Sequence, residues 1–255
     1  MANVLCCSGL DPTGGAGIQA DIEAVAAQGA HALAVVTALT VQDTRNVTRS
    51  VAVEPALLQQ QLSVLLADCA VDAIKIGLLG DAAQLPVLAD VLARCNRPVV
   101  IDPILRAGGG RELVGQGFAQ AFGEALFPYC TVLTPNAAEA RRWTGCEMLD
   151  AAGERLLAMG AQHVLITGGD EPDTVVHNRW YSRSGLRVFK HARIAGHFHG
   201  AGCTLAAAIA ARLALGESVE LALETAQAYV AQTLRTATAV GQGRWVPRRI
   251  AAGAA

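Results

Sequence analysis

The stretch VLCCSGLDPTGGAGIQAD, residues 4–21, decides the fold class. It opens with a short apolar run, Val4–Cys7, typical of a buried strand, and a glycine-rich turn leads into a helix expected over residues 16–28. Gly14, Gly15 and Gly17 let the backbone approach a ligand, and the N–H groups of the following helix attract anions. The turn lacks the Lys-Ser/Thr ending of a P-loop and does not match GxGxxG, so by itself it also fits a tightly packed turn.

The same alternation of strand and helix continues along the chain. The pattern predicts strands at residues 32–39, 73–76, 99–102, 131–134 and 164–167, and helices at 55–68, 82–93, 116–125, 137–143 and 151–159. Residues 175–189 predict an antiparallel hairpin turning near Ser184–Gly185, and two Ala-rich helices, 203–214 and 219–237, close the chain. Short runs of Val and Ile between helices favour a parallel sheet covered on both faces. We therefore expect one α/β domain over residues 1–255, with three layers: a central, mostly parallel sheet flanked by helices, and a late β-hairpin.

Composition excludes several classes of protein. A net charge of -2 and only 16% charged residues give no basic field for nucleic acid or an anionic membrane. The N-terminus has no basic region and the apolar runs fall short of the roughly 20 residues that span a bilayer. Seven cysteines without a CxxC spacing favour reduced, mostly buried thiols over a zinc site. These features predict a cytoplasmic protein with no membrane and no nucleic-acid partner.

Two loops after predicted strands carry candidate magnesium and nucleotide chemistry. Asp102 ends the VVID run, where a carboxylate can hold Mg²⁺ directly or through water, although a turn cap fits as well. Asn136 and Glu139 in TPNAAE have the spacing of a helix capping box, which is the interpretation that the local sequence favours.

A further loop, HGAGCT at residues 199–204, opens an Ala-rich helix. Its glycines leave N–H groups free to converge on an anion, with the helix dipole behind them. A thiol at Cys203 is expected to have a lowered pKa there and to act as a base. An ordinary packed loop is the alternative.

Taken together and in this order, the motifs identify a family. DPTGGAGIQAD, TALTVQDT, KIGLLG, VIDPILRAGGG, TPNAAEA, ITGGD and HGAGCT run from Asp11 to Thr204. The chain closely resembles the hydroxymethylpyrimidine/phosphomethylpyrimidine kinases of thiamine biosynthesis, which have the ribokinase-like fold. The resemblance implies ATP as donor, Mg²⁺ as cofactor and a homodimer. It also implies successive phosphorylation of 4-amino-5-hydroxymethyl-2-methylpyrimidine and of its monophosphate.

The resemblance also implies a role for individual residues. Gln42 is expected to read the aminopyrimidine, because a side-chain amide offers both a donor and an acceptor. The rest of the substrate pocket would be formed by Gly9, Asp21, the backbone near Thr40, Leu78 and Ile104. The nucleotide side would be formed by Asn136, Glu139, Thr167, Gly168 and Gly169, and the candidate metal ligands are Asp102 and Glu139. Cys203 corresponds to the family's proposed base, at an anion hole formed by Gly200, Ala201 and Gly202.

Two departures from the family pattern keep alternatives open. Gly108 and Thr167 stand where many members carry Lys, and Arg106 is the candidate to replace the first of these cations at the phosphates. A pyridoxal or pyridoxine kinase of the same superfamily is the alternative enzyme. A catalytically weakened pyrimidine-binding module is the alternative from another class. His197 and His199 lie beside the anion loop, which consists of Gly200, Ala201 and Gly202, and neither is assigned a role.

Overall fold

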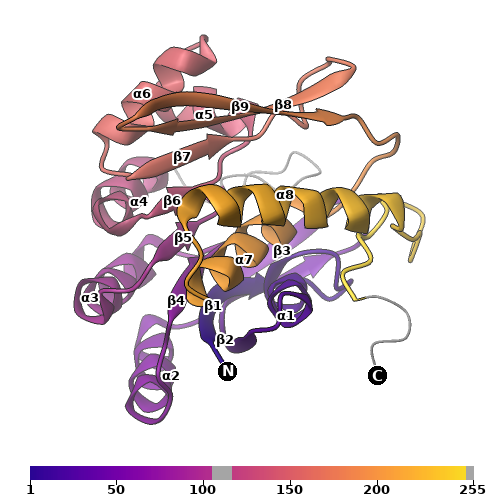
Figure 1. Cartoon of the computed structure of the whole chain (residues 1–255). Helices are drawn as coiled ribbons and strands as arrows, with labels where there is room; N and C mark the ends of the chain where they lie inside the picture. Colours follow the sequence, from indigo (N-terminus) through magenta and orange to yellow (C-terminus); the bar gives the residue numbers. More distant parts are fainter. Residues whose placement is uncertain (105–116, 251–255) are drawn as a thin grey trace.

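A computed structural model describes residues 1–104 and 117–250 of the chain. Within these residues, nine strands form one sheet in the order β3-β2-β1-β4-β5-β6-β7-β8-β9 (Figure 1). The strands are β1 Asn3–Leu10, β2 His31–Gln42, β3 Val47–Ala52, β4 Ala73–Ile76, β5 Val99–Ile101, β6 Val132–Leu133, β7 His163–Ile166, β8 Val175–Ser182 and β9 Gly185–Ala192. The six strands from β2 to β7 in the sheet are parallel, whereas β3, β8 and β9 pair antiparallel.

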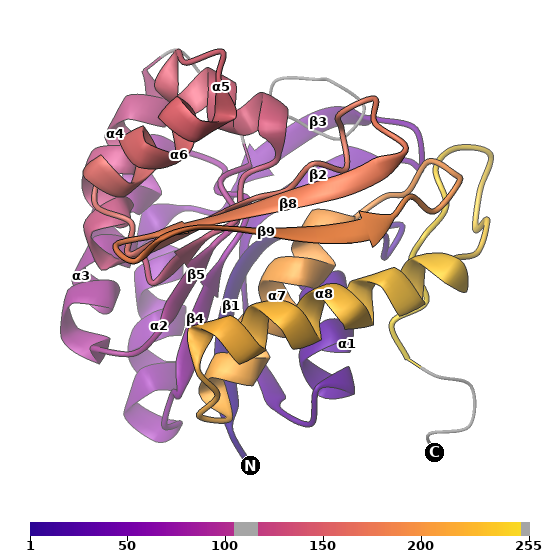
Figure 2. The ribbon, with the colours of Figure 1, turned by 45° about the horizontal axis from the view of Figure 1, so that its top comes forward.

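Helices cover both faces of the sheet (Figures 1 and 2). One face packs against α1 Gly17–Ala27, α7 Ala201–Ala214 and α8 Val219–Arg235, and the other against α2 Pro55–Asp68, α3 Leu85–Cys95, α4 Phe118–Leu126, α5 Ala137–Thr144 and α6 Leu149–Ala158. Each face has its own buried hydrophobic cluster. The predicted three-layer α/β fold with a late hairpin is therefore confirmed.

The parallel strands and α7 show why this sequence adopts this arrangement. All four residues of β4 are buried, as expected for a strand covered by helices on both sides. Helix α7 is buried almost all round because its alanines let it lie close to α1, α8 and the sheet. Among the described residues, no helix is both long and apolar enough to cross a membrane.

Strand β3 and the end of β2 were not predicted from the sequence. Strand β3 reads VTRSVA and lies at the sheet edge, so its exposed polar residues hide the apolar signal of a strand. The turn before it is held by Asp43, whose Oδ1 accepts hydrogen bonds from the backbone N–H groups of Arg45 at 2.8 Å and Asn46 at 2.9 Å. This hairpin carries Gln42 at the end of β2, beside the loop that follows β1.

Candidate active site

The candidate site lies where the order of the sheet reverses. Strand β1 pairs with β2 on one side and with β4 on the other, so the chain crosses over beside β1. Ligands of open α/β sheets bind outside the carboxyl ends of the strands at such a point. The loops after β1, β2, β4 and β5 meet there, and the start of α7 joins them.

The two glycine-rich loops predicted to bind phosphate are in direct contact. Gly200 has φ +84°, and a Cβ built on it would lie 1.8 Å from the carbonyl oxygen of Gly15. A Cβ on Gly15 would in turn lie 2.2 Å from Cδ2 of His199. Gly202 faces the carboxylate of Asp102, whose Oδ2 would be 3.8 Å from an added Cβ. A side chain at Gly200 or Gly15 would therefore clash with these neighbours, so both positions require glycine. Gly202 leaves the approach to Asp102 open.

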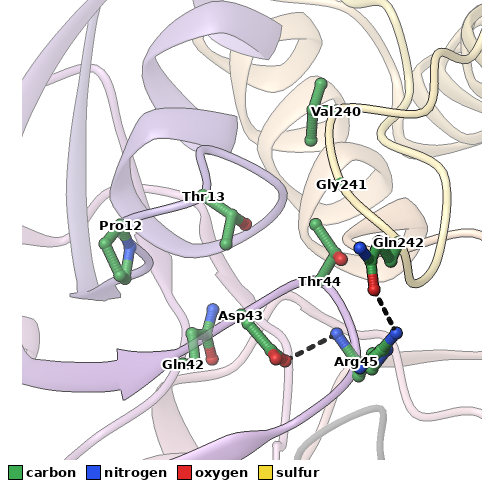
Figure 3. A pocket seen from close by; sticks show the side chains of 9 residues that line it. All are labelled: Pro12, Thr13, Gln42, Asp43, Thr44, Arg45, Val240, Gly241 and Gln242. Atoms are coloured by element: carbon green, nitrogen blue, oxygen red, sulfur yellow. Dashed lines mark hydrogen bonds between the residues drawn. The ribbon is translucent and has the colours of Figure 1, made fainter.

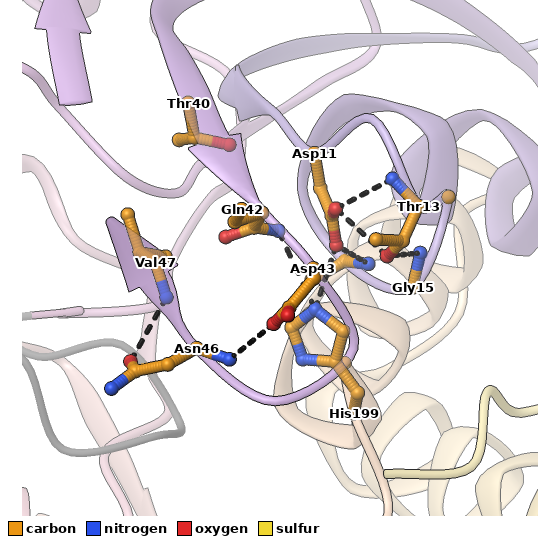
Figure 4. Close-up of polar contacts among 12 residues, drawn as sticks. Asp11, Thr13, Gly15, Thr40, Gln42, Asp43, Asn46, Val47 and His199 are labelled. Carbon is orange, nitrogen blue, oxygen red and sulfur yellow. Dashed lines mark hydrogen bonds and ion pairs between the residues drawn. The ribbon is translucent and has the colours of Figure 1, made fainter. Parts of the chain in front are cut away.

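Asp11 is the centre of a polar cluster beside these loops (Figure 4). Its Oδ1 accepts hydrogen bonds from the backbone N and from Oγ1 of Thr13, both at 2.8 Å, and its Oδ2 accepts from the backbone N of Ala16 at 2.9 Å. Nε2 of His199 lies 2.7 Å from the same Oδ2. Burial opposes ionisation of Asp11, but the hydrogen bonds from His199, Gln42 and Thr13 outweigh it and hold the pKa of Asp11 well below its usual range.

Gln42 lies at the rim of this cluster. Its Nε2 is 3.5 Å from Nε2 of His199, and its half-buried side chain lines a pocket of about 420 Å³ (Figure 3). The pocket is also lined by Pro12, Thr13, Asp43, Thr44, Arg45, Val240, Gly241 and Gln242. His199, to which no role was assigned, is thus a buried partner of Asp11, and Asp11 was missed as a site residue although it belongs to the DPTGG motif.

The other residues expected around the acceptor lie on neighbouring strand ends. Gly9 contacts Leu78, because an added Cβ would lie 2.9 Å from Cδ2 of Leu78. Thr40 donates its hydroxyl to the carbonyl of Leu10 at 2.8 Å. The backbone N of Ile104 donates to the carbonyl of Asp102 at 2.9 Å. These positions bring Gly9, Leu78 and Ile104 to the carboxyl ends of β1, β4 and β5.

The residues expected at the nucleotide gather around the start of α5. Asn136 and Glu139 form the capping box that the local sequence favoured, with hydrogen bonds of 2.8 and 2.9 Å to each other's backbone N–H groups. Thr167 forms a parallel bridge with Asn136, and the backbone N of Gly168 donates to Oδ1 of Asn178 at 3.0 Å. Burial, followed by the charge of Asp102, raises the pKa of Glu139 to about 8. Arg106 lies outside the described residues, as does Gly108.

Comparison with known proteins decides the family. The sequence profile of the family described as phosphomethylpyrimidine kinase matches residues 11–247. The chain belongs to the phosphomethylpyrimidine kinase family. It is 38% identical over 247 residues to the hydroxymethylpyrimidine/phosphomethylpyrimidine kinase of Synechococcus elongatus, covering 94% of each chain. A bifunctional thiamine biosynthesis protein of Geobacter sulfurreducens is 37% identical over 253 residues, 94% of this chain, which spans about half (51%) of that protein's length.

Solved structures of two kinds of vitamin kinase are similar to this phosphomethylpyrimidine kinase family member. The ADP complex of Bacillus subtilis pyridoxal kinase superposes with a TM-score of 0.90 at 29% identity, covering 98% of this chain and 97% of that one. A phosphomethylpyrimidine kinase of Clostridium difficile gives a TM-score of 0.79 at 27% identity, with coverages of 91% and 98%. The chain is therefore a small-molecule kinase with the ribokinase-like fold, and ATP is its donor class.

Within the kinase, the prediction of a low-pKa thiol at Cys203 is wrong. Cys203 is the third residue of α7, but it is 7% exposed, and burial raises the pKa of its thiol to about 12. The charge of Lys75 opposes this increase without cancelling it. The loss of hydration therefore outweighs the helix dipole, and the thiol is neutral at physiological pH.

Asp102 is an ionisable group that faces Gly202 of the anion loop. Burial raises the pKa of Asp102 to about 6, against the opposing effects of Lys75 and of a hydrogen bond from the Cys203 thiol. A carboxylate with a pKa near 6 is suited to exchange a proton or bind a cation at neutral pH. Cys203 is thus a hydrogen-bonding neighbour of Asp102.

Asp21 occupies a different place from the one expected. Its carboxylate is fully buried, accepts a 2.5 Å hydrogen bond from the hydroxyl of Ser8 and lies 2.9 Å from Nζ of Lys75. Burial alone would lower the pKa of Lys75, but Asp21 outweighs it and raises that pKa. This ion pair beneath the site was missed as a unit, although a single Lys inside the buried strand AIKI was its sequence signal.

Proposed function

We propose that this kinase transfers the terminal phosphate of ATP to 4-amino-5-hydroxymethyl-2-methylpyrimidine, to its monophosphate, or to both. The observation that carries the proposal is the position of Gln42, whose amide lies next to Asp11 and His199 at the acceptor end of the site. An amide held at that place pairs with a ring nitrogen beside an exocyclic amine. The curated relatives that cover nearly the whole chain carry the same activity in their names.

The proposed mechanism is positioning and charge neutralisation around an in-line transfer. The N–H groups at the start of α7, from Ala201 to Cys203, bind the transferred phosphate with the helix dipole behind them. Asp102 beneath them accepts the proton of the acceptor hydroxyl or orients it, and the neutral Cys203 thiol holds that carboxylate by a hydrogen bond. A loose transition state needs little help from a strong base.

Asp102 and Glu139 fit the demands of a magnesium ion. Both carboxyls have raised pKa values, about 6 and about 8, and the charge of Asp102 is one cause of the increase at Glu139. Two neighbouring acids that resist ionisation are stabilised as carboxylates by a divalent cation. Mg²⁺ takes one or two protein carboxylates and completes its shell with phosphates and water, and there it would neutralise charge on the nucleotide.

A pyridoxal kinase is the second candidate, favoured by the TM-score of 0.90 to the Bacillus subtilis enzyme. Coupled assays of ATP consumption with the pyrimidine alcohol, its monophosphate and pyridoxal decide between the two. The proposal expects the largest kcat/KM for one of the pyrimidines. A larger value for pyridoxal would overturn it.

We also propose that the chain is a single cytoplasmic kinase domain that forms a homodimer. The face of β2 and β3 supports the dimer, because Leu39, Val41 and Val51 are 50%, 57% and 42% exposed side by side on adjacent strands. Leu10 on β1 pairs with Leu39 and extends this apolar strip. Sedimentation of the purified protein tests the assembly.

A further inference from the structure

The segment after α8 returns to the active site and brings Arg244 with it. The backbone N of Trp245 donates to the carbonyl of His197 at 2.8 Å, and its carbonyl accepts from the backbone N of His199 at 2.8 Å. The backbone N of Arg244 donates to the carbonyl of Thr44 at 3.0 Å, two residues after Gln42. The backbone of Arg244 is thereby fixed between residues 197–199, which lead into the anion loop, and Thr44, which lies in the turn after β2.

The side chain of Arg244 is half-buried, and one of its donors, the Nε–H, has no hydrogen-bond partner in the part of the chain that the structure describes. This Nε atom is buried, and it forms no hydrogen bond with those residues. Arg249 on the same segment is, by contrast, hydrogen-bonded through each of its guanidinium nitrogens. Its guanidinium donates to Oγ1 of Thr204 at 2.8 Å, to Glu23 at 3.1 Å and to the carbonyls of Gly14 and Gly15. A buried donor without a partner is costly, and an arginine left in this state points to an acceptor supplied by a ligand.

Asp11 interacts electrostatically with Arg244 but cannot be that acceptor. Burial lowers the pKa of Arg244, and the charge of Asp11 opposes the decrease. The two oxygens of Asp11 already accept two hydrogen bonds from Thr13 and one from Ala16, and Oδ2 also lies against His199. Together with the hydrogen bond from Gln42, these contacts occupy the lone-pair sites of the carboxylate.

The position of Arg244 indicates which ligand supplies the anion. Thr44 and Asp11 follow β2 and β1, on the acceptor side of the site, whereas Asn136 and Thr167 on the nucleotide side follow β6 and β7. We propose that Arg244 binds the anionic group of a phosphorylated acceptor and so determines how well the kinase uses the pyrimidine monophosphate. This inference rests on the proposed function. The planar fork of an arginine suits a phosphate, because it can donate two parallel hydrogen bonds.

The test compares two acceptors in the intact enzyme. Arg244→Gln removes the charge and is expected to raise KM for the pyrimidine monophosphate by roughly ten- to a hundredfold, the usual loss for a charge-assisted hydrogen bond. KM for the pyrimidine alcohol and for ATP is expected to stay within about twofold, and Arg244→Lys is expected to recover part of the loss. Arg248→Gln is the matched control, because Arg248 is on the same segment and exposed.

Each outcome supports or overturns the inference. Equal increases of KM for the alcohol and the monophosphate, or no increase for either, would overturn it. Because Arg244→Gln could fail to fold, phenylglyoxal labelling of the unmodified enzyme is the second measurement. The monophosphate is expected to protect Arg244 from labelling and the alcohol is not, and protection by both or by neither contradicts the inference. If the wild-type enzyme phosphorylates neither pyrimidine, the proposed function has failed, whereas the labelling result still reports whether Arg244 meets the monophosphate.

Discussion

Replacing Asp102 by Asn is expected to make the protein more stable while removing most of its activity. Asp102 is a 4% exposed residue whose carboxyl faces Gly202 of the anion loop, and burial raises its pKa from 3.8 to about 6. At neutral pH Asp102 is ionised in the folded protein, and its buried charge lowers the free energy of unfolding. Asn has nearly the same shape without the charge, so the variant avoids this loss of stability and loses the ionised group that the mechanism needs.

The size of the effect follows from the two pKa values. A shift from 3.8 to about 6 corresponds to about 3 kcal/mol at pH values above both. Because the folded pKa is the higher one, the unfolded state binds fewer protons between the two values, and Asp102 lowers stability progressively as pH rises through this window. The gain from Asp102→Asn is thus expected to approach about 3 kcal/mol at pH 7.5 and to fall below about 1 kcal/mol at pH 4.

Urea unfolding followed by circular dichroism at the two pH values measures this difference. Asp90→Asn is the control, because Asp90 lies on the surface of α3 in an exposed ion pair with Arg94. Asp102→Asn with unchanged or lower stability at pH 7.5, and an unchanged unfolding slope, would refute the inference that Asp102 is a strained carboxylate.

Three further predictions concern the acceptor and the loops. Gln42→Leu is expected to raise KM for the pyrimidine by roughly five- to a hundredfold, which corresponds to the loss of about 1–3 kcal/mol for a paired amide. An equal increase of KM for ATP would indicate a structural role instead. Gly200→Ala is expected to abolish turnover, because the φ of Gly200 is +84° and the new Cβ would overlap the carbonyl oxygen of Gly15. A variant with a normal kcat would contradict this contact between the two loops. Iodoacetamide at pH 7.5 is expected to label the half-buried Cys146 before Cys203, because burial raises the pKa of the Cys203 thiol to about 12. Peptide mass spectrometry measures the two rates. Faster labelling of Cys203 would support a thiolate at that position.

The layered fold could be predicted because each of its signals is local. Pro55–Asp68 and Ala73–Ile76 have the bounds that the apolar pattern gave them, since each is a continuous amphipathic or apolar segment. Strand β3 escaped because it is stabilised by pairing with β2, and its own sequence, VTRSVA, is half polar. Edge strands depend on a partner that lies elsewhere in the chain.

The site could be predicted in part for the same reason. The glycines of the two phosphate loops were recognisable, but their mutual contact through Gly15 and Gly200 depends on residues 185 positions apart in the chain. The error at Cys203 came from treating the start of a helix in isolation, because burial against the sheet outweighs the dipole. Asp21 was expected at the substrate, yet Lys75 from β4 pairs with it in the interior.

The identity of the acceptor is the central claim, and a competition experiment tests it most directly. The enzyme is incubated with ATP, Mg²⁺ and equal concentrations of the hydroxymethylpyrimidine alcohol, its monophosphate and pyridoxal, and the early products are identified by mass spectrometry. Since Gln42 places an amide at the acceptor end of the site, the newly phosphorylated pyrimidine is expected to form in excess. Pyridoxal phosphate as the main product would contradict this account.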